Sequence, residues 1–337
     1  DLAAAFAPCA AFLNQTHSLQ ERLGLAVRRQ RLGSLRVIED NRERLSRYER
    51  LLVDWNRASL GGRNLEALRI IREVDAITPE SPMSNYLRGF EALGVNRPRE
   101  TVETYARYRE PSARQRVISV WRLGILTEAL HMLGRHEEEV AATHASRELF
   151  ADQLALRTYE IRGLAALGRV EQVTQVIEDS LELQPGQWTA GYVMLVAAKE
   201  LRAHGHPRDA REVAQRAVGW CRSRPEQERS TRDQRTDLAE ALYSLGRWDE
   251  AQELYVALAE EDPDDLDSRG RLGAIAYRMG EIEEAERVYR ELVGLDRPFL
   301  FGAHLMNAAC IAAVRGQREQ AVDLIREALA QGFSWNI

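Results

Sequence analysis

Three short groups of polar side chains could support metal binding or catalysis. His204-Gly-His206 offers two imidazoles, but two histidines without further ligands rarely make a metal site. Residues 262–267 resemble part of a calcium loop, yet they lack the glycine at the sixth place, and no glutamate stands at the twelfth. The glutamates at 137–139 open an expected helix, where the helix dipole favours acidic side chains. The sequence therefore predicts no metal and no cofactor.

Motifs of known catalytic chemistry are missing from the sequence. It has no phosphate-binding glycine loop, no Gly-x-Ser-x-Gly and no His-Glu-x-x-His. The three cysteines, Cys9, Cys221 and Cys310, are far apart and odd in number, so they predict neither a disulfide framework nor a metal site. We predict no catalytic residues and expect that the chain is not an enzyme.

Composition narrows the class of protein further. The 337 residues suggest two domains or one elongated array. A net charge of −6 argues against nucleic acid as a partner, and no apolar run is long enough to predict a membrane span. Lys199 is the only lysine among 46 basic residues, a bias typical of a GC-rich bacterial genome.

A turn residue recurs along the chain at intervals close to 34 residues. Three intervals are 34 residues, from 62 to 96, from 134 to 168 and from 246 to 280, and the others run from 36 to 41. The turn residues are Gly62, Asn96, Gly134, Gly168, Gly205, Gly246, Gly280 and Gly316. Glycine and asparagine tolerate the left-handed conformation at a helix end, so each predicts the turn of a helical hairpin.

Small and apolar residues keep fixed distances from these turns. Alanine stands five residues after most of them, where a small side chain lets two helices approach: Ala67, Ala210, Ala251, Ala285 and Ala321. Thr101, Glu139 and Val173 replace that alanine in three units, and there we expect looser packing or a shift of one residue. Prolines close several units, as proline cannot continue a helix: Pro79, Pro185, Pro263 and Pro298.

This pattern resembles the tetratricopeptide repeat family over about residues 45–331, most closely in the last four units. The residues that carry the resemblance best are Leu272, Gly273, Ala276, Gly280, Ala285, Tyr289 and Pro298, and the stretch 245–255. The resemblance implies an all-α fold, an α-solenoid forming a right-handed superhelix of about eight helical hairpins. With residues 41–52 before them, the repeats also look like arrays in bacterial signalling proteins, which implies a sensor or scaffold segment.

The expected organisation is an N-terminal helical cap at 1–44, the array at 45–331 and a C-terminal tail at 332–337. Helices are expected at 2–13 and 17–32, then in pairs at 45–60 with 64–77, 83–94 with 98–109, 117–133 with 137–150, 153–167 with 170–183, 188–204 with 207–222, 232–245 with 248–261, 266–279 with 282–294 and 302–315 with 318–331. Residues 221–230 are expected to form a polar loop.

The resemblance implies that the first helix of each pair lines a concave groove. Positions three, six, ten and thirteen before each turn residue share one helix face. From these positions we predict partner-binding residues: Tyr86, Phe90, Trp121, Glu128, His131, Arg162, Tyr192, Lys199, Arg202, Glu240, Tyr243 and Tyr277. They suggest a protein–protein interaction scaffold that binds a protein or peptide.

Basic side chains on this face suggest the chemistry of the partner. Arg162, Lys199 and Arg202 would cluster beside aromatic side chains, an arrangement that suits an acidic peptide, a chain-end carboxylate or a phosphate. The competing interpretation is that these cations are solvated and salt-bridged to Glu128 and Glu240.

Two other functions stay open on the sequence. The ends of the array could join copies into homo-oligomers or filaments, with Phe6, Phe333 and Trp335 as assembly residues. A helical-repeat RNA reader is the weaker alternative, because the basic stretch 22–50 stands against an acidic total and an uneven period.

The two ends of the sequence and its few cysteines give information on the cellular compartment of the protein. The chain starts at Asp1 and ends in 331–337 as if cut from something longer or processed. The sparse cysteines favour a cytoplasmic location, and an extracytoplasmic one stays open because of the processed N-terminus.

Overall fold

The computed structural model describes residues 35, 38–79, 81–106, 116–183, 188–295, 302–331 and 333. Within these ranges the chain forms helices joined by turns, with no strand, which confirms the all-α fold predicted from the sequence. No helix in the described ranges is long and apolar enough to span a bilayer. The expected helices 2–13 and 17–32, with Phe6, lie outside the described residues, as does Trp335.

Two compact units make up the fold, and each is described by itself. Unit 1 comprises Asp1–Ala129, Leu295–Met306 and Val322–Trp335. Its helices are η2 (Arg42–Arg44), α4 (Arg47–Leu60), α5 (Asn64–Ile77), α6 (Pro82–Gly94), α7 (Pro98–Ala106) and most of α8 (Arg116–Met132). Helix α4 packs on α5, α5 on α6 and α6 on α7, so the unit contains two successive helical hairpins.

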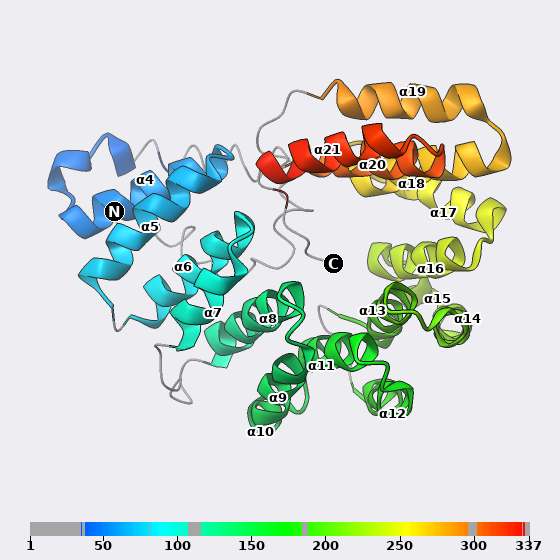
Figure 1. Ribbon diagram of the computed structural model, residues 1–337, viewed down its shortest axis with the longest axis horizontal. Helices are drawn as coiled ribbons and strands as arrows, with labels where there is room; N and C mark the ends of the chain where they lie inside the picture. Colours follow the sequence, from blue (N-terminus) through cyan, green and yellow to red (C-terminus); the bar gives the residue numbers. More distant parts are fainter. Residues whose placement is uncertain are drawn as a thin grey trace. The chain divides into compact units, whose positions relative to one another are not determined.

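Unit 2 comprises Leu130–Gly294, Asn307–Ala321 and Asn336–Ile337. Its helices are α9 (His136–Ala145), α10 (Arg147–Phe150), α11 (Leu154–Ala166), α12 (Val170–Leu181), α13 (Ala190–Ala203), α14 (Pro207–Ser223), α15 (Glu226–Arg229), α16 (Arg232–Leu245), α17 (Trp248–Glu261), α18 (Leu266–Met279) and α19 (Ile282–Val293). Figure 1 shows its hairpins following one another in chain order, from α11 in green to α19 in orange. Helices α20 (Ala303–Val314) and α21 (Arg318–Ala330) contribute residues to both units.

The hairpins of unit 2 have a first and a second helix. The first helices are α11, α13, α16 and α18, and the second helices are α12, α14, α17 and α19. One apolar core runs from Val140 of α9 through α11 to α17, built largely from alanine, valine and leucine, with Ile275 of α18 at its other end. Because each hairpin buries its apolar side against its neighbours, the repeats stabilise one another.

The turn residues predicted from the sequence all adopt the left-handed conformation. Asn96 has φ of 58°, and the seven turn glycines have φ between 67° and 90°. At Gly246 the amide donates back to the carbonyl of Tyr243, and the next amide donates to Leu242, which ends helix α16. A side chain other than glycine or asparagine would be strained at these places.

The alanine positions five residues after the turns are closely packed. Ala67, Ala210, Ala251 and Ala285 have no exposed surface. Thr101, Glu139 and Val173 are equally buried, so these units keep the register, and the expected looser packing or one-residue shift is wrong. Opposite Glu139 stands Gly163, where an added Cβ would lie 3.2 Å from the Glu139 Cγ. A glycine on the facing helix thus provides the room that the missing alanine would have left.

Two boundaries differ from the sequence-based expectation. The helix expected at 137–150 is interrupted at Ser146, whose hydroxyl donates to the Ala142 carbonyl and so disturbs the helical ladder. The expected loop at 221–230 is largely helical, because α14 continues to Ser223 and α15 follows directly after Pro225.

Candidate functional site

Glu240 stands at the centre of a charged network on the first helices of unit 2. Its Oε1 accepts from Arg271 Nε at 2.7 Å and from the Tyr255 hydroxyl at 2.5 Å. Its Oε2 lies 3.2 Å from Lys199 Nζ and accepts from Arg271 at 3.1 Å. Burial opposes ionisation of Glu240, but the charges of Arg271 and Lys199 outweigh it and hold its pKa well below the usual range. The network joins α13, α16 and α18, and Tyr255 adds a contact from α17.

Both cations and carboxyl groups lie around this network. Lys199 and Arg271 pair with Glu240, Asp237 also interacts electrostatically with Lys199, and the Lys199 side chain is 39% exposed. Arg202 adds a third, exposed cation on the next turn of α13, where its guanidinium donates to the Ser244 carbonyl at 2.6 Å. The face therefore offers two solvent-accessible cations, Lys199 and Arg202, to an approaching ligand.

Aromatic side chains border these cations. Arg271 lies over the ring of Tyr243, 4.6 Å from its centroid. Tyr192, Tyr243 and Tyr277 are all partly exposed, and Tyr192 stacks on Trp188 with centroids 6.4 Å apart. We call Lys199, Arg202, Glu240, Tyr243 and Arg271 the basic patch. The sequence analysis predicted all of these except Arg271, which lies nine residues before its turn glycine.

Arg162 does not join the basic patch. It is buried, and its Nε donates to Glu139 Oε1 at 2.7 Å. Of the three cations expected to cluster, the structure thus turns one inward, while Lys199 and Arg202 remain on the surface of α13. The pairing expected for Lys199 with Glu240 is present.

The predicted partner-binding residues of unit 1 lie in packed surroundings. Tyr86 is 2% exposed, and its ring stacks with that of the half-buried Phe90 at 6.3 Å. Trp121 and Glu128 are also buried. Phe333, predicted for assembly, is partly buried, and its carbonyl accepts a hydrogen bond from Asn96 Nδ2 at 3.0 Å. These aromatic side chains mainly stabilise the unit.

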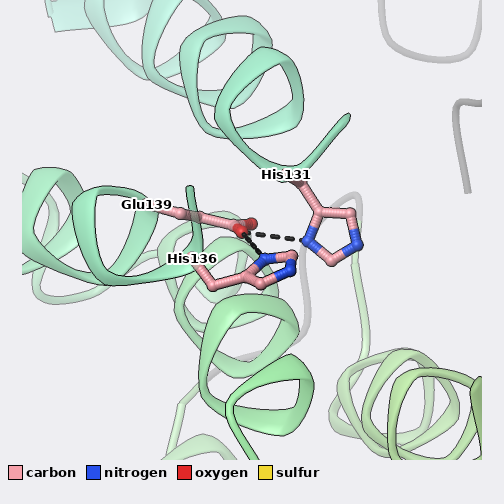
Figure 2. A group of neighbouring side chains, drawn as sticks. All are labelled: His131, His136 and Glu139. Carbon is pink, nitrogen blue, oxygen red and sulfur yellow. Dashed lines mark hydrogen bonds and ion pairs between the residues drawn. The ribbon is translucent and has the colours of Figure 1, made fainter. Parts of the chain in front are cut away.

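His131, His136 and Glu139 meet in unit 2 where the end of α8 faces the start of α9 (Figure 2). One oxygen of Glu139, Oε2, lies 2.9 Å from His131 Nδ1 and 3.4 Å from His136 Nδ1. Figure 2 shows the other ring nitrogen of His131 directed away from Glu139. Glu139 is fully buried, and because Arg162 and the histidines outweigh that burial, its pKa is lowered to about 2.

Helix α13 adds Glu200 and His204 to these side chains. Glu200 Oε2 lies 3.3 Å from His131 Nε2 and 3.4 Å from His204 Nε2. Burial opposes protonation of His131, but its hydrogen bonds to Glu139 and Glu200 outweigh this effect and raise its pKa to about 9. We call His131, His136, Glu139, Glu200 and His204 the histidine cluster.

Sequence reasoning named only His131 of this cluster as a site residue. The other members are separated by up to 68 positions and come from α9 and α13, so no local motif unites them. One signal was present: Glu139 occupies a position where the repeat requires a small buried side chain. A charged residue there needs partners, because an unpaired buried carboxylate is costly.

Comparisons with known proteins add the following. The family model described as tetratricopeptide repeat matches residues 236–298. No curated protein matches the chain. A similar solved structure is a tetratricopeptide repeat protein from Parabacteroides merdae, with 12% identity, 86% of this chain and 94% of that chain covered, and a TM-score of 0.40. Another is the Rap protein complexed with competence and sporulation factor, with 12% identity, 98% of this chain and 97% of that chain covered, and a TM-score of 0.43. The human IFIT1 dimer with m7Gppp-AAAA is also similar, with 15% identity, 98% of this chain and 82% of that chain covered, and a TM-score of 0.41.

The recurring hairpins with their left-handed turns and buried alanines define an α-solenoid, a class of protein that works as a binding scaffold. Residues 236–298 match the tetratricopeptide repeat model, and the described residues outside that stretch form helical hairpins of the same kind.

Proposed function

We propose that this protein is a non-catalytic scaffold that binds an acidic peptide segment of a partner protein on the basic patch. The observation that carries the proposal is the gathering of Lys199, Arg202 and Arg271 near Glu240 on neighbouring first helices. Lys199 and Arg202 are solvent-accessible, so a partner carboxylate would pair with them.

The chemistry of the patch favours a peptide over a small ion. Tyr243 lies under Arg271 and Tyr192 stacks on Trp188, so flat apolar surfaces stand beside the charges. A peptide offers both carboxylates for the guanidinium groups and side chains for these aromatic rings. The patch is held in place by α13, α16 and α18, which gives it a fixed shape before a ligand binds.

A peptide array tests this proposal. We expect the wild-type chain to bind Asp- and Glu-rich peptides in preference to neutral or basic ones, with binding that weakens as salt increases. The variant K199E/R202E/R271E should lose this binding. The variant R208E/R211E/R290E makes the same charge change at exposed positions of the second helices and should retain it.

Two results would contradict the proposal. One is equal binding by the two variants; the other is no preference for acidic peptides in the wild-type chain. Growth of molecular mass with concentration in light scattering, abolished by deletion of 332–337, would instead favour the alternative of self-assembly through the ends of the array. We also propose, from the sequence resemblance alone, that the chain is the sensor or scaffold segment of a bacterial signalling protein.

A further inference from the structure

We propose that the histidine cluster is a binding site for a divalent transition metal of the zinc class, held by His131 Nε2, His204 Nε2 and Glu200 Oε2. These three atoms come from the end of α8 and the end of α13 and lie within 4.8 Å of one another. Two imidazoles and one carboxylate, with a further position left open, form a donor set that zinc uses in proteins. This site is separate from the basic patch and does not depend on the proposed peptide binding.

The spacing of the donor atoms fits a tetrahedral ion. Metal–ligand bonds of ~2.0–2.1 Å to imidazole and carboxylate place two ligands of a tetrahedron about 3.3 Å apart. Glu200 Oε2 lies 3.3 Å from the His131 nitrogen and 3.4 Å from the His204 nitrogen. The donors therefore need little movement to close around an ion.

Helix geometry supports the same site. Glu200 and His204 are four residues apart, so the last turn of α13 and its C-cap place them on one face. His131 lies in the last turn of α8. Since the carboxyl end of a helix carries partial negative charge, both helix ends favour a cation between them.

The residues around the donors complete the arrangement. When His131 binds an ion through Nε2, its Nδ1–H donates to Glu139 Oε2, 2.9 Å away. Glu139 is in turn fixed by Arg162, 2.7 Å from its other oxygen. A carboxylate behind a metal-binding histidine fixes the ring and makes it a better ligand. Arg162, which lies outside the basic patch, is therefore a positioning residue that holds Glu139 in place.

A second triad, His131 Nδ1, His136 Nδ1 and Glu139 Oε2, also lies within 4.8 Å. It is the weaker candidate, because the ion pair with Arg162 already neutralises Glu139. An ion there would stand beside a buried guanidinium, whereas Glu200 pairs with two histidines, His131 and His204. The His136 ring instead packs edge-on against the ring of His204, with centroids 5.3 Å apart.

Metal titration of the full chain tests the assignment. Tag-free protein is stripped with a chelator and titrated with Zn²⁺ in a calorimeter, and with Co²⁺ while the visible absorption of a tetrahedral complex is followed. We expect one ion per chain. H204A and E200Q should weaken binding by more than about 100-fold, and E139Q by about 10–100-fold, the range for loss of a carboxylate behind a ligand.

Two control variants make the result specific. H206A removes an imidazole two residues from His204 that belongs to neither triad, and H136A removes the distinctive ligand of the second triad; both should leave one ion bound per chain. Circular dichroism checks that each variant is folded, and H204A, at the partly exposed end of α13, carries the test if E200Q is unfolded.

Two outcomes would overturn the proposal. Loss of binding in H136A with binding kept in H204A would assign the ion to the second triad. Absence of stoichiometric Zn²⁺ or Co²⁺ binding in the wild-type chain would mean that Glu200 pairs with the histidines themselves and not with a metal ion.

Discussion

The basic patch and the histidine cluster of unit 2 both compensate the charge of glutamates, but they use different cationic side chains. Glu240 of the basic patch and Glu139 of the histidine cluster are both buried carboxylates whose pKa is lowered because neighbouring cations outweigh burial. Around Glu240 the compensating cations are Lys199 and Arg271, and the charge of Glu240 raises the pKa of Arg271 well above its usual value. Around Glu200 the partners are histidines, which can exchange a proton for a metal ion. The first arrangement suits permanent recognition of an anion, and the second suits an exchangeable ligand.

The largest effect should come from removing Arg162, whose guanidinium pairs with Glu139 of the histidine cluster. R162M leaves Glu139 fully buried beside histidines alone, and breaking a buried pair in this way costs about 3–5 kcal/mol of the free energy of unfolding. Urea denaturation measures it. R169M, which breaks the exposed pair with Glu137, should cost no more than about 1 kcal/mol. A similar small cost for both would mean that the histidines alone suffice for Glu139.

Another buried glutamate sharpens the comparison, because no cation in the part of the chain that the structure describes forms an ion pair with it. In unit 1, Glu91 is fully buried and accepts from the Trp55 indole at 2.7 Å, and since burial dominates, its pKa is raised to about 7. The folded chain therefore holds a proton that the unfolded chain releases near pH 4.5. Stability contributed by this proton is present below pH 4.5 and is lost as the pH rises through about 7.

E91Q tests this pH dependence directly. The glutamine keeps an oxygen for Trp55 but cannot ionise, so the variant should gain stability over wild type from pH 5 to pH 8, by up to about 3 kcal/mol. Urea denaturation across this range measures the difference. D237N probes the same window in unit 2, where burial raises the pKa of Asp237 to about 7. A constant difference between wild type and E91Q would contradict the account.

The basic patch should tolerate loss of one cation better than the histidine cluster does. In R271M, Glu240 keeps Lys199 and the Tyr255 hydroxyl, so we expect a cost of about 1–3 kcal/mol, the loss of hydrogen bonds to a charged group. Denaturation of R271M beside R162M checks the order. A larger loss in R271M would show that Lys199 does not share the charge of Glu240.

The smallest effect concerns the room made for Glu139. An added methyl at Gly163 would lie 2.9 Å from a Val140 methyl, so G163A should destabilise the chain by about 1–3 kcal/mol. Gly219 of α14 has open space at the same atom, and G219A should stabilise by about 0.5–1 kcal/mol, as expected for alanine in a helix. Thermal melting of the two variants measures these changes in stability. A stabilising G163A would contradict the close packing of Gly163 against α9.

The fold was accessible from the sequence because its signals are local. Every predicted turn residue has a positive φ, since the left-handed helix end selects glycine or asparagine directly. The hairpins follow from these turns and from alanines such as Ala210 and Ala251, which lie where helices approach. The break at Ser146 depends on one hydroxyl hydrogen bond, which no periodicity predicts.

The candidate sites were only partly accessible, because they depend on which helix faces which. Spacing from the turns correctly placed Lys199, Arg202 and Glu240 on the first helices. It could not show that Arg162 turns toward Glu139, nor that His204 meets His131 across two helices. Those pairings arise from side-chain direction and tertiary contacts, which have no fixed sequence separation.

The most direct test of the scaffold function is hydrogen–deuterium exchange of the chain with and without an acidic peptide selected on the array. The account predicts that bound peptide slows exchange in α13, α16 and α18, and leaves α14, α17 and α19 unchanged. Protection confined to the second helices, or no protection at a saturating peptide concentration, would contradict it.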